Sequence, residues 1–137
     1  MKQLTHQYTQ SPKFINQLDF DSFETYALPG GYVLTTAGGV DTQAQKTNSY
    51  KKDSPAGEAL IRILQKPVLD IPMSSKMPIY RNAIVFYNAA GTIVGSLNVD
   101  FDIDSMAIDS LTHINADAGT YTLLRDFFEK AGHASVK

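Results

Sequence analysis

The chain contains no cysteine and no tryptophan, and it has no long run of apolar residues. Without cysteine there is no disulfide, no thiolate nucleophile and no thiolate metal ligand. No apolar stretch approaches the roughly 20 residues that a membrane-spanning helix needs. The polar start "MKQLTHQYTQSPKF" also lacks the apolar core of a secretory signal. These absences predict a cytoplasmic protein with no membrane segment.

The chain also has no large excess of charge of either sign. Twelve Lys and Arg residues stand against fourteen Asp and Glu residues, which gives a net charge of −2, and the longest basic block is "KK" at 51–52. This balance argues against a nucleic-acid partner. The glycine pairs match no phosphate-binding motif, no G-x-S-x-G serine elbow occurs, and no pair of histidines has metal-ligand spacing. The sequence therefore predicts no cofactor.

What is present fits one domain. A chain of 137 residues, 43% of them apolar, is long enough to bury about two-thirds of its unfolded surface. We predict a single α+β domain over residues 1–137, with an antiparallel β-sheet and helices packed on one face. Residues 1–10 are polar and expected to be loosely ordered. Residues 37–53 read as a long polar loop, either mobile or functional.

The clearest pattern is "IYRNAIVFYNAAGTIVGSLNVDFDID", residues 79–104. Its β-branched and aromatic residues predict a strand over 79–87, and Gly91 suits the left-handed position of a hairpin loop. From residue 93 apolar and polar residues alternate, which predicts a second strand with Leu97 and Val99 on a covered face.

The remaining elements follow from caps, turns and periodicity. Ser11, Ser54 and Gly132 mark the ends of helices expected over 11–18, 55–65 and 119–133. A turn at Pro29 and Gly30 joins strands expected over 23–28 and 32–36, with a helix over 21–28 as the competing interpretation. A short strand is expected over 68–73, and residues 105–114 are a candidate helix.

Three aspartates end the hairpin, and they raise the question of a metal site. "VDFD" is similar to the Asp-x-Asp pairs of nucleotide-sugar transferases and of haloacid-dehalogenase-type phosphatases, but both of those folds need parallel βα units. We favour a simpler interpretation, in which Asp100, Asp102 and Asp104 lie on the solvent-facing side of the strand and discourage aggregation. The alternative is a metal-assisted enzyme that uses Asp100, Asp102 and the interior histidine His113.

His113 itself is more simply a surface histidine at the end of a short helix. The other histidines, His6 and His133, lie near the termini. Tyr50, Tyr80, Arg81 and Tyr87 are residue types that protein interfaces favour. Together with the three aspartates they form the predicted binding residues.

The block "AIVFYNAAGTIVGSLNV" and the ending "LLRDFFEKAGH" resemble a pattern in short proteins of Bacteroidetes-type bacteria, in which such a hairpin precedes a C-terminal helix. The resemblance covers about a third of the chain. It implies a similar hairpin-and-helix arrangement, and that family has no assigned activity. Its members often carry cysteines after the second strand, where this chain reads "DFDIDSM", so a thiol role would not carry over.

The absence of a catalytic constellation and the one-domain size favour a non-enzymatic protein that binds another macromolecule, for example an inhibitor or immunity-type partner of a toxin. Its acidic groups would steer a basic partner towards it. The alternatives are the metal-assisted enzyme and a self-associating structural protein, such as a homodimer formed through the hairpin edge.

Overall fold

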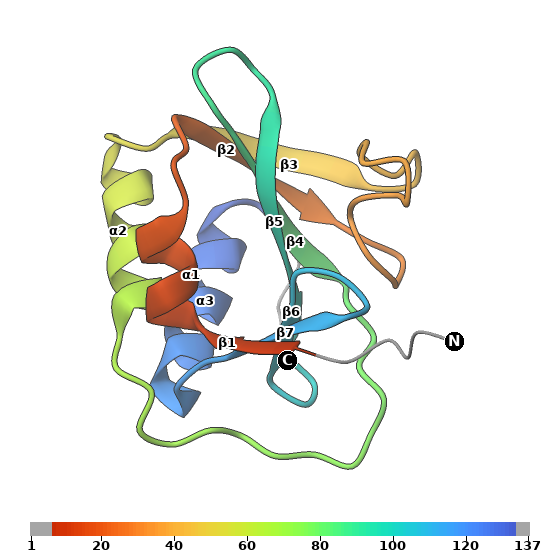
Figure 1. The fold of residues 1–137 in the computed structure, drawn as a ribbon, viewed down its shortest axis with the longest axis vertical. Coiled ribbons are helices and arrows are strands. Elements are labelled where there is room, and N and C mark those ends of the chain that lie inside the picture. The colour runs from red at the N-terminus through yellow and green to blue at the C-terminus, as the bar shows by residue number, and fades with distance from the viewer. Residues whose placement is uncertain (1–6, 134–137) are drawn as a thin grey trace.

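The computed structural model describes residues 7–133, which form one seven-stranded sheet and three helices (Figure 1). The strands are β1 (Gln7–Gln10), β2 (Ser22–Ala27), β3 (Gln45–Lys51), β4 (Asn82–Tyr87), β5 (Ile93–Asp100), β6 (Ser105–Ala107) and β7 (Thr112–Asn115). The helices are α1 (Ser11–Gln17), α2 (Pro55–Gln65) and α3 (Ala118–Lys130). The strand order is β1-β7-β6-β5-β4-β2-β3, and every neighbouring pair is antiparallel except β1 with β7. The predicted α+β class is confirmed.

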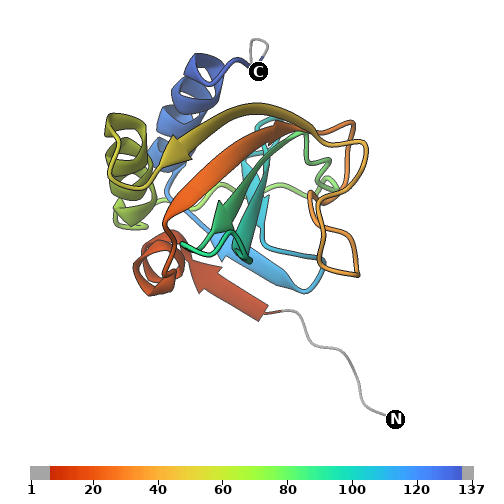
Figure 2. The ribbon, with the colours of Figure 1, turned by 90° about the horizontal axis from the view of Figure 1, so that it is seen from above.

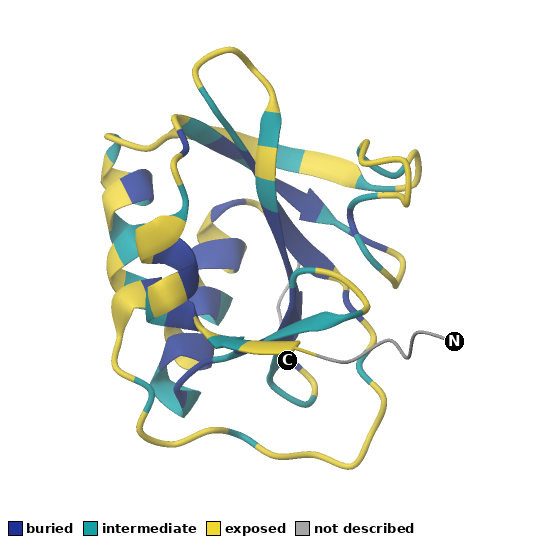
Figure 3. Cartoon of the chain, in the orientation of Figure 1, coloured by how far each residue is buried: buried dark blue, intermediate teal, exposed yellow. Residues whose placement is uncertain are grey.

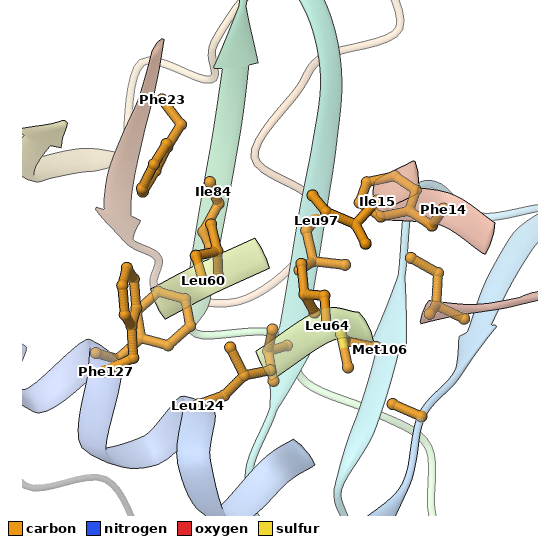
Figure 4. Close-up of a cluster of buried hydrophobic side chains, with 14 of the residues drawn as sticks. Phe14, Ile15, Phe23, Leu60, Leu64, Ile84, Leu97, Met106, Leu124 and Phe127 are labelled. Atoms are coloured by element: carbon orange, nitrogen blue, oxygen red, sulfur yellow. The ribbon is translucent and has the colours of Figure 1, made fainter. Parts of the chain in front are cut away.

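The sheet curls strongly, so its two faces meet different parts of the chain. Seen from above, the helices lie on one side of it and the long link between β2 and β3 lies on the other (Figure 2). One apolar cluster collects residues of all three helices and the sheet, including the fully buried Phe23, Leu60 and Leu124 (Figure 4). The second cluster, around Val33 and Val85, receives no helical residue among those described. Both faces of the central strands are therefore covered.

The predicted hairpin is confirmed, with shorter strands. β4 and β5 pair in antiparallel register, and Gly91 has a φ of +83°. Asn88 fixes the turn, because its side-chain oxygen accepts hydrogen bonds from the backbone N–H groups of Ala90 and Thr92 at 3.0 and 2.9 Å. An asparagine that bonds its own turn is a common hairpin device.

The three predicted helices are also confirmed. Ser54 caps α2 by accepting a hydrogen bond from Gly57 N at 3.0 Å, and Gly132 follows α3 with a φ of +103°. Only the predicted N-cap residue of α1, Ser11, is wrong. Gln10 takes the N-cap position with no side-chain hydrogen bond, whereas Ser11 is inside the helix and buried.

Several predictions for the first half of the chain are corrected by the structure. Residues 45–51, assigned to the polar loop 37–53, form the edge strand β3, because they pair with β2. Residues 22–27 form a strand, which removes the helical alternative, but residues 32–36 contribute only a single bridge between Leu34 and Val40. Residues 7–10 of the supposedly loose segment form β1 beside β7, and residues 1–6, including His6, lie outside the described part of the chain.

Two later predictions are wrong as well. Residues 68–73 form no strand; residues 66–81 run without regular secondary structure from α2 to β4. Residues 105–114 are not a helix, because they supply β6 and most of β7. Local sequence does not distinguish these short strands from a helix, and only pairing within the sheet decides their conformation.

None of the helices that residues 7–133 form is long and apolar enough to cross a membrane.

Candidate functional site

We call residues 66–81, which link α2 to β4, the strap. It crosses the lower end of the molecule as an extended chain (Figure 1). A buried carboxylate anchors each of its ends. At the first end, Asp117 Oδ1 accepts hydrogen bonds from Leu69 N at 3.0 Å and Asp70 N at 2.9 Å. At the second end, Asp100 Oδ2 accepts one from Ile79 N at 2.8 Å. The strap is therefore held at two fixed points.

Asp117 has a second role, since its Oδ2 caps α3 by accepting a hydrogen bond from Gly119 N at 2.9 Å. The N–H groups of Leu69, Gly119 and Asp70 lower the pKa of Asp117, because they stabilise its charged form. The start of α3 and the first half of the strap are thus joined through one ionised side chain.

Between the two anchors the strap exposes apolar side chains. Leu69, Met73 and Met77 are 88%, 89% and 84% exposed, the highest values among the large apolar residues described. Ile71 and Ile79 are exposed as well, and the same region is coloured as exposed along the bottom of Figure 3. Concentrated apolar exposure of this kind marks interaction surfaces.

A cavity of about 230 Å³ lies beneath the strap, between it and the ends of β6 and β7. Met73 and Lys76 of the strap line it, together with His113 and Tyr121. His113 lies on β7, not at a helix end as predicted, and its ring stacks on Tyr8 of β1 at 5.5 Å between centroids. The strap thus has space behind it as well as solvent in front.

The three aspartates do not share one exposed face, so that prediction is wrong. Asp100 is only 4% exposed, and its Oδ1 accepts a hydrogen bond from Asp102 N at 2.8 Å. This bond to a residue two positions ahead bends the chain and ends β5 at residue 100. Asp102 is exposed and pairs with Arg81 at 3.4 Å.

Asp104 takes a left-handed conformation with a φ of +53° and pairs with Arg125 at 3.1 Å. Burial raises the pKa of Asp104, and the guanidinium opposes that rise. Arg125 also donates to Phe101 O at 2.6 Å, so it closes the turn after β5. The chain therefore has no acidic face at this position to steer a basic partner.

The predicted interface tyrosines are buried or partly buried. Tyr80 is 2% exposed and packs against Tyr32 at 5.3 Å between ring centroids. Tyr50 is half-buried, with its ring 5.3 Å from that of Phe23. Tyr87 donates from its hydroxyl to Glu24 at 2.9 Å. Of the predicted binding residues, the exposed ones are Arg81 and Asp102.

The metal-assisted interpretation finds no matching cluster. Within residues 7–133, no group of three or more His, Cys, Asp or Glu side chains is placed to hold a metal ion. Both oxygens of Asp100 already accept backbone hydrogen bonds, and His113 lies in the cavity under the strap. The structure does not bring Asp100, Asp102 and His113 together as one site.

The hairpin edge predicted for self-association is only partly covered by other strands. β4 is paired along its whole length with β2 and β5, whereas β6 pairs only with residues 98–100 of β5, so residues 93–97 of β5 are paired on the β4 side alone. The outermost strands of the sheet are β1, which has four residues, and β3, which carries Lys46, Lys51 and a bulge opposite Thr25. Short, charged or bulged edges resist pairing with another sheet.

Comparisons with protein-family models, curated proteins and solved structures found no match. The site is therefore interpreted from the residues of this chain.

Sequence reasoning missed the strap, the buried His133 and the partly buried Glu24. His133, set aside as terminal, is buried, and burial lowers its pKa to about 4. Its Nδ1 donates to Asn82 Oδ1 at 2.6 Å, and its Nε2 accepts from the hydroxyl of Thr47 at 2.8 Å. This neutral ring fastens the end of α3 to β3 and β4. The three prolines at 67, 72 and 78 were the available signal for an irregular, displayed segment.

Glu24 is the second missed group. It accepts hydrogen bonds from the hydroxyls of Tyr26 and Tyr87 at 2.6 and 2.9 Å and pairs with Lys46 at 3.3 Å. Burial alone would raise the pKa of Glu24, but these donors outweigh it and the pKa is lowered. Tyr87 belongs to β4 and Lys46 to β3, so this cluster ties β2 to both neighbouring strands.

Proposed function

We propose that the protein acts by binding another protein, and that the strap is its recognition element. The observation that carries this proposal is the exposure of Leu69, Met73 and Met77 on a segment that Asp117 and Asp100 hold at both ends. Ordering a loop on binding costs conformational entropy, and a loop already fixed at two points loses less. The proposed setting is the cytoplasm, as the cysteine-free sequence predicts.

The chemistry of the strap suggests what the partner offers. Methionine is unbranched and polarisable, so it adapts to an apolar groove of irregular shape. Burying a leucine or methionine side chain contributes about 1.5–3 kcal/mol each. The exposed charges of the strap are Asp70, Lys66, Lys76 and Arg81, of which Arg81 already pairs with Asp102. We therefore propose a partner with an apolar groove, bound with little dependence on salt; an inhibitor or immunity-type complex is one concrete form.

Site-specific photo-crosslinking in cells tests the proposal directly. A photoreactive residue placed at Met73 should form one dominant adduct with a second protein. The matched control is Leu123, which is also exposed but lies on α3. The expected result is an adduct from position 73 that is absent from position 123 and that persists when the salt concentration is raised during isolation of the complex.

Triple substitution of Leu69, Met73 and Met77 by serine should abolish co-purification of the crosslinked partner without altering the circular dichroism spectrum. Equal crosslinking from positions 73 and 123, or none from position 73, would contradict the proposal. An adduct of the chain with itself would instead favour the self-associating alternative.

A further inference from the structure

A second cavity, of about 460 Å³, opens on the other side of the sheet from the helices. Three segments line it: the tip of the β2–β3 link at residues 34–38, the start of β5, and the turn between β6 and β7 at residues 108–110. The tip is well fixed, since Thr35 N donates to Gly39 O at 2.8 Å and Asp41 N to Val33 O at 2.8 Å. The volume falls within the range of small-molecule sites, roughly 300–1,000 Å³.

A buried asparagine, Asn98, connects the segments around this cavity. Asn98 Oδ1 accepts a hydrogen bond from Val33 N at 2.8 Å, and its Nδ2 donates to Ala107 O and Ile108 O at 3.1 Å each. The same side chain therefore joins the β2–β3 link, β5 and β6. The cavity is built into the fold and does not depend on a loose loop.

Most of the wall is apolar. Leu34, Ile93 and Ile108 form part of it, and Tyr32 presents its ring on one side. The Tyr32 ring is held by Tyr80, with 5.3 Å between centroids and 44° between planes. An aromatic ring beside aliphatic side chains suits a flat hydrocarbon or aromatic group.

The wall contains one charged residue, Asp109. Its Oδ1 accepts hydrogen bonds from Leu111 N and Thr112 N, both at 2.9 Å, which fixes the direction of the carboxylate. No residue among 7–133 donates a hydrogen bond to its Oδ2. Burial and the negative charge of Asp109 both raise the pKa of Tyr32, as expected for a phenol close to this carboxylate.

We propose that this cavity binds a small amphipathic cation, an organic amine whose apolar part packs between Tyr32 and Ile108 and whose ammonium group pairs with Asp109 Oδ2. Charge complementarity selects this class, because the only charged side chain among the residues that line the wall is that of Asp109, which is exposed and whose Oδ1 is fixed by the turn. The tyrosine ring adds the attraction of a cation for an aromatic face. This site is separate from the strap and does not depend on the proposed function.

Three probes of nearly equal shape but different charge, phenethylamine, 2-phenylethanol and phenylacetate, show how ligand charge affects the affinity. Titrations followed by NMR should show saturable shifts at Leu34, Ile93 and Ile108 with the amine. The alcohol should bind about two- to fivefold more weakly, since an exposed ion pair contributes about that factor. Phenylacetate should bind more weakly still.

The variant Asp109→Asn keeps the Oδ1 acceptor of the turn and removes the charge. We expect it to reduce the affinity for the amine to that for the alcohol and to leave the affinity for the alcohol unchanged. Val94 lines the cavity and is exposed, so Val94→Trp should block all three probes, whereas Leu123→Trp on α3 should block none.

The proposal is overturned if the amine and the alcohol bind the native protein equally, if Asp109→Asn keeps the preference for the amine, or if none of the probes shifts these signals. Binding of phenylacetate in preference to the amine would contradict it as well.

Discussion

Asp100 and Asp102 have the same side chain and lie two residues apart, yet the structure predicts very different costs for removing them. The carboxylate of Asp100 is 4% exposed and accepts hydrogen bonds from Ile79 N and Asp102 N, both at 2.8 Å. Replacing Asp100 by alanine leaves two backbone donors without a partner. A buried donor that loses its partner costs about 1–3 kcal/mol. Because water can reach part of this turn, we expect Asp100→Ala to lower the free energy of unfolding by about 2–4 kcal/mol.

Asp102→Ala removes one exposed ion pair with Arg81, at 3.4 Å. Such pairs contribute about 0–1 kcal/mol, so the expected loss is below about 1 kcal/mol. Asp100→Asn keeps one acceptor oxygen and should fall between the two alanine variants. In a domain of this size, the loss in Asp100→Ala corresponds to a fall in Tm of roughly 10 °C.

Urea denaturation followed by circular dichroism measures all three variants, with a constant m-value as the check that the folded state is unchanged. Hydrogen exchange adds a local readout, since the amide of Ile79 should exchange faster in Asp100→Ala than in Asp102→Ala. Equal free energies for the two alanine variants would refute the reasoning, because they would mean that both carboxylates are solvated.

Further outcomes are expected at other positions. The pKa of His133 falls from about 6.5 in the unfolded chain to about 4 in the folded one. Its contribution of about 3 kcal/mol to the free energy of unfolding is therefore present above pH 6.5 and is lost as the pH falls towards 4. Urea midpoints at pH 7 and pH 4.5 should differ less in His133→Gln than in the native protein. Gly132→Ala should cost about 1–2 kcal/mol, because alanine is strained at a φ of +103°. Leu60→Ala empties a fully buried position and should cost about 2–5 kcal/mol, whereas Leu123→Ala, half-exposed on α3, should change stability by less than about 1 kcal/mol in the same assay.

The fold was predictable where one local signal was enough. The serine cap and periodic leucines of α2, the apolar stripe of α3 and the glycine of the β4–β5 turn all follow from neighbouring residues. The errors lie in segments whose conformation depends on distant partners. β3 is polar and becomes a strand because β2 lies beside it, and β6 is three residues long.

The candidate site was less predictable, because its geometry depends on contacts between distant residues. Tyr80 and Tyr87 are residue types common in interfaces, but Tyr80 is buried and Tyr87 is partly buried, with its hydroxyl bonded to Glu24. The exposure of Leu69 and Met73 depends on Asp117, which is more than forty residues away in the sequence. No sequence pattern within the strap predicts its hydrogen bonds to Asp117.

The sequence alone determined the class of the fold, the three helices and the central hairpin, because caps, turns and hydrophobic periodicity act over a few residues. Tertiary structure alone decided which carboxylates are buried, which apolar side chains face solvent and where the cavities lie. Those properties arise when both faces of a curled sheet are covered by segments far apart in the chain, and no local pattern carries that information.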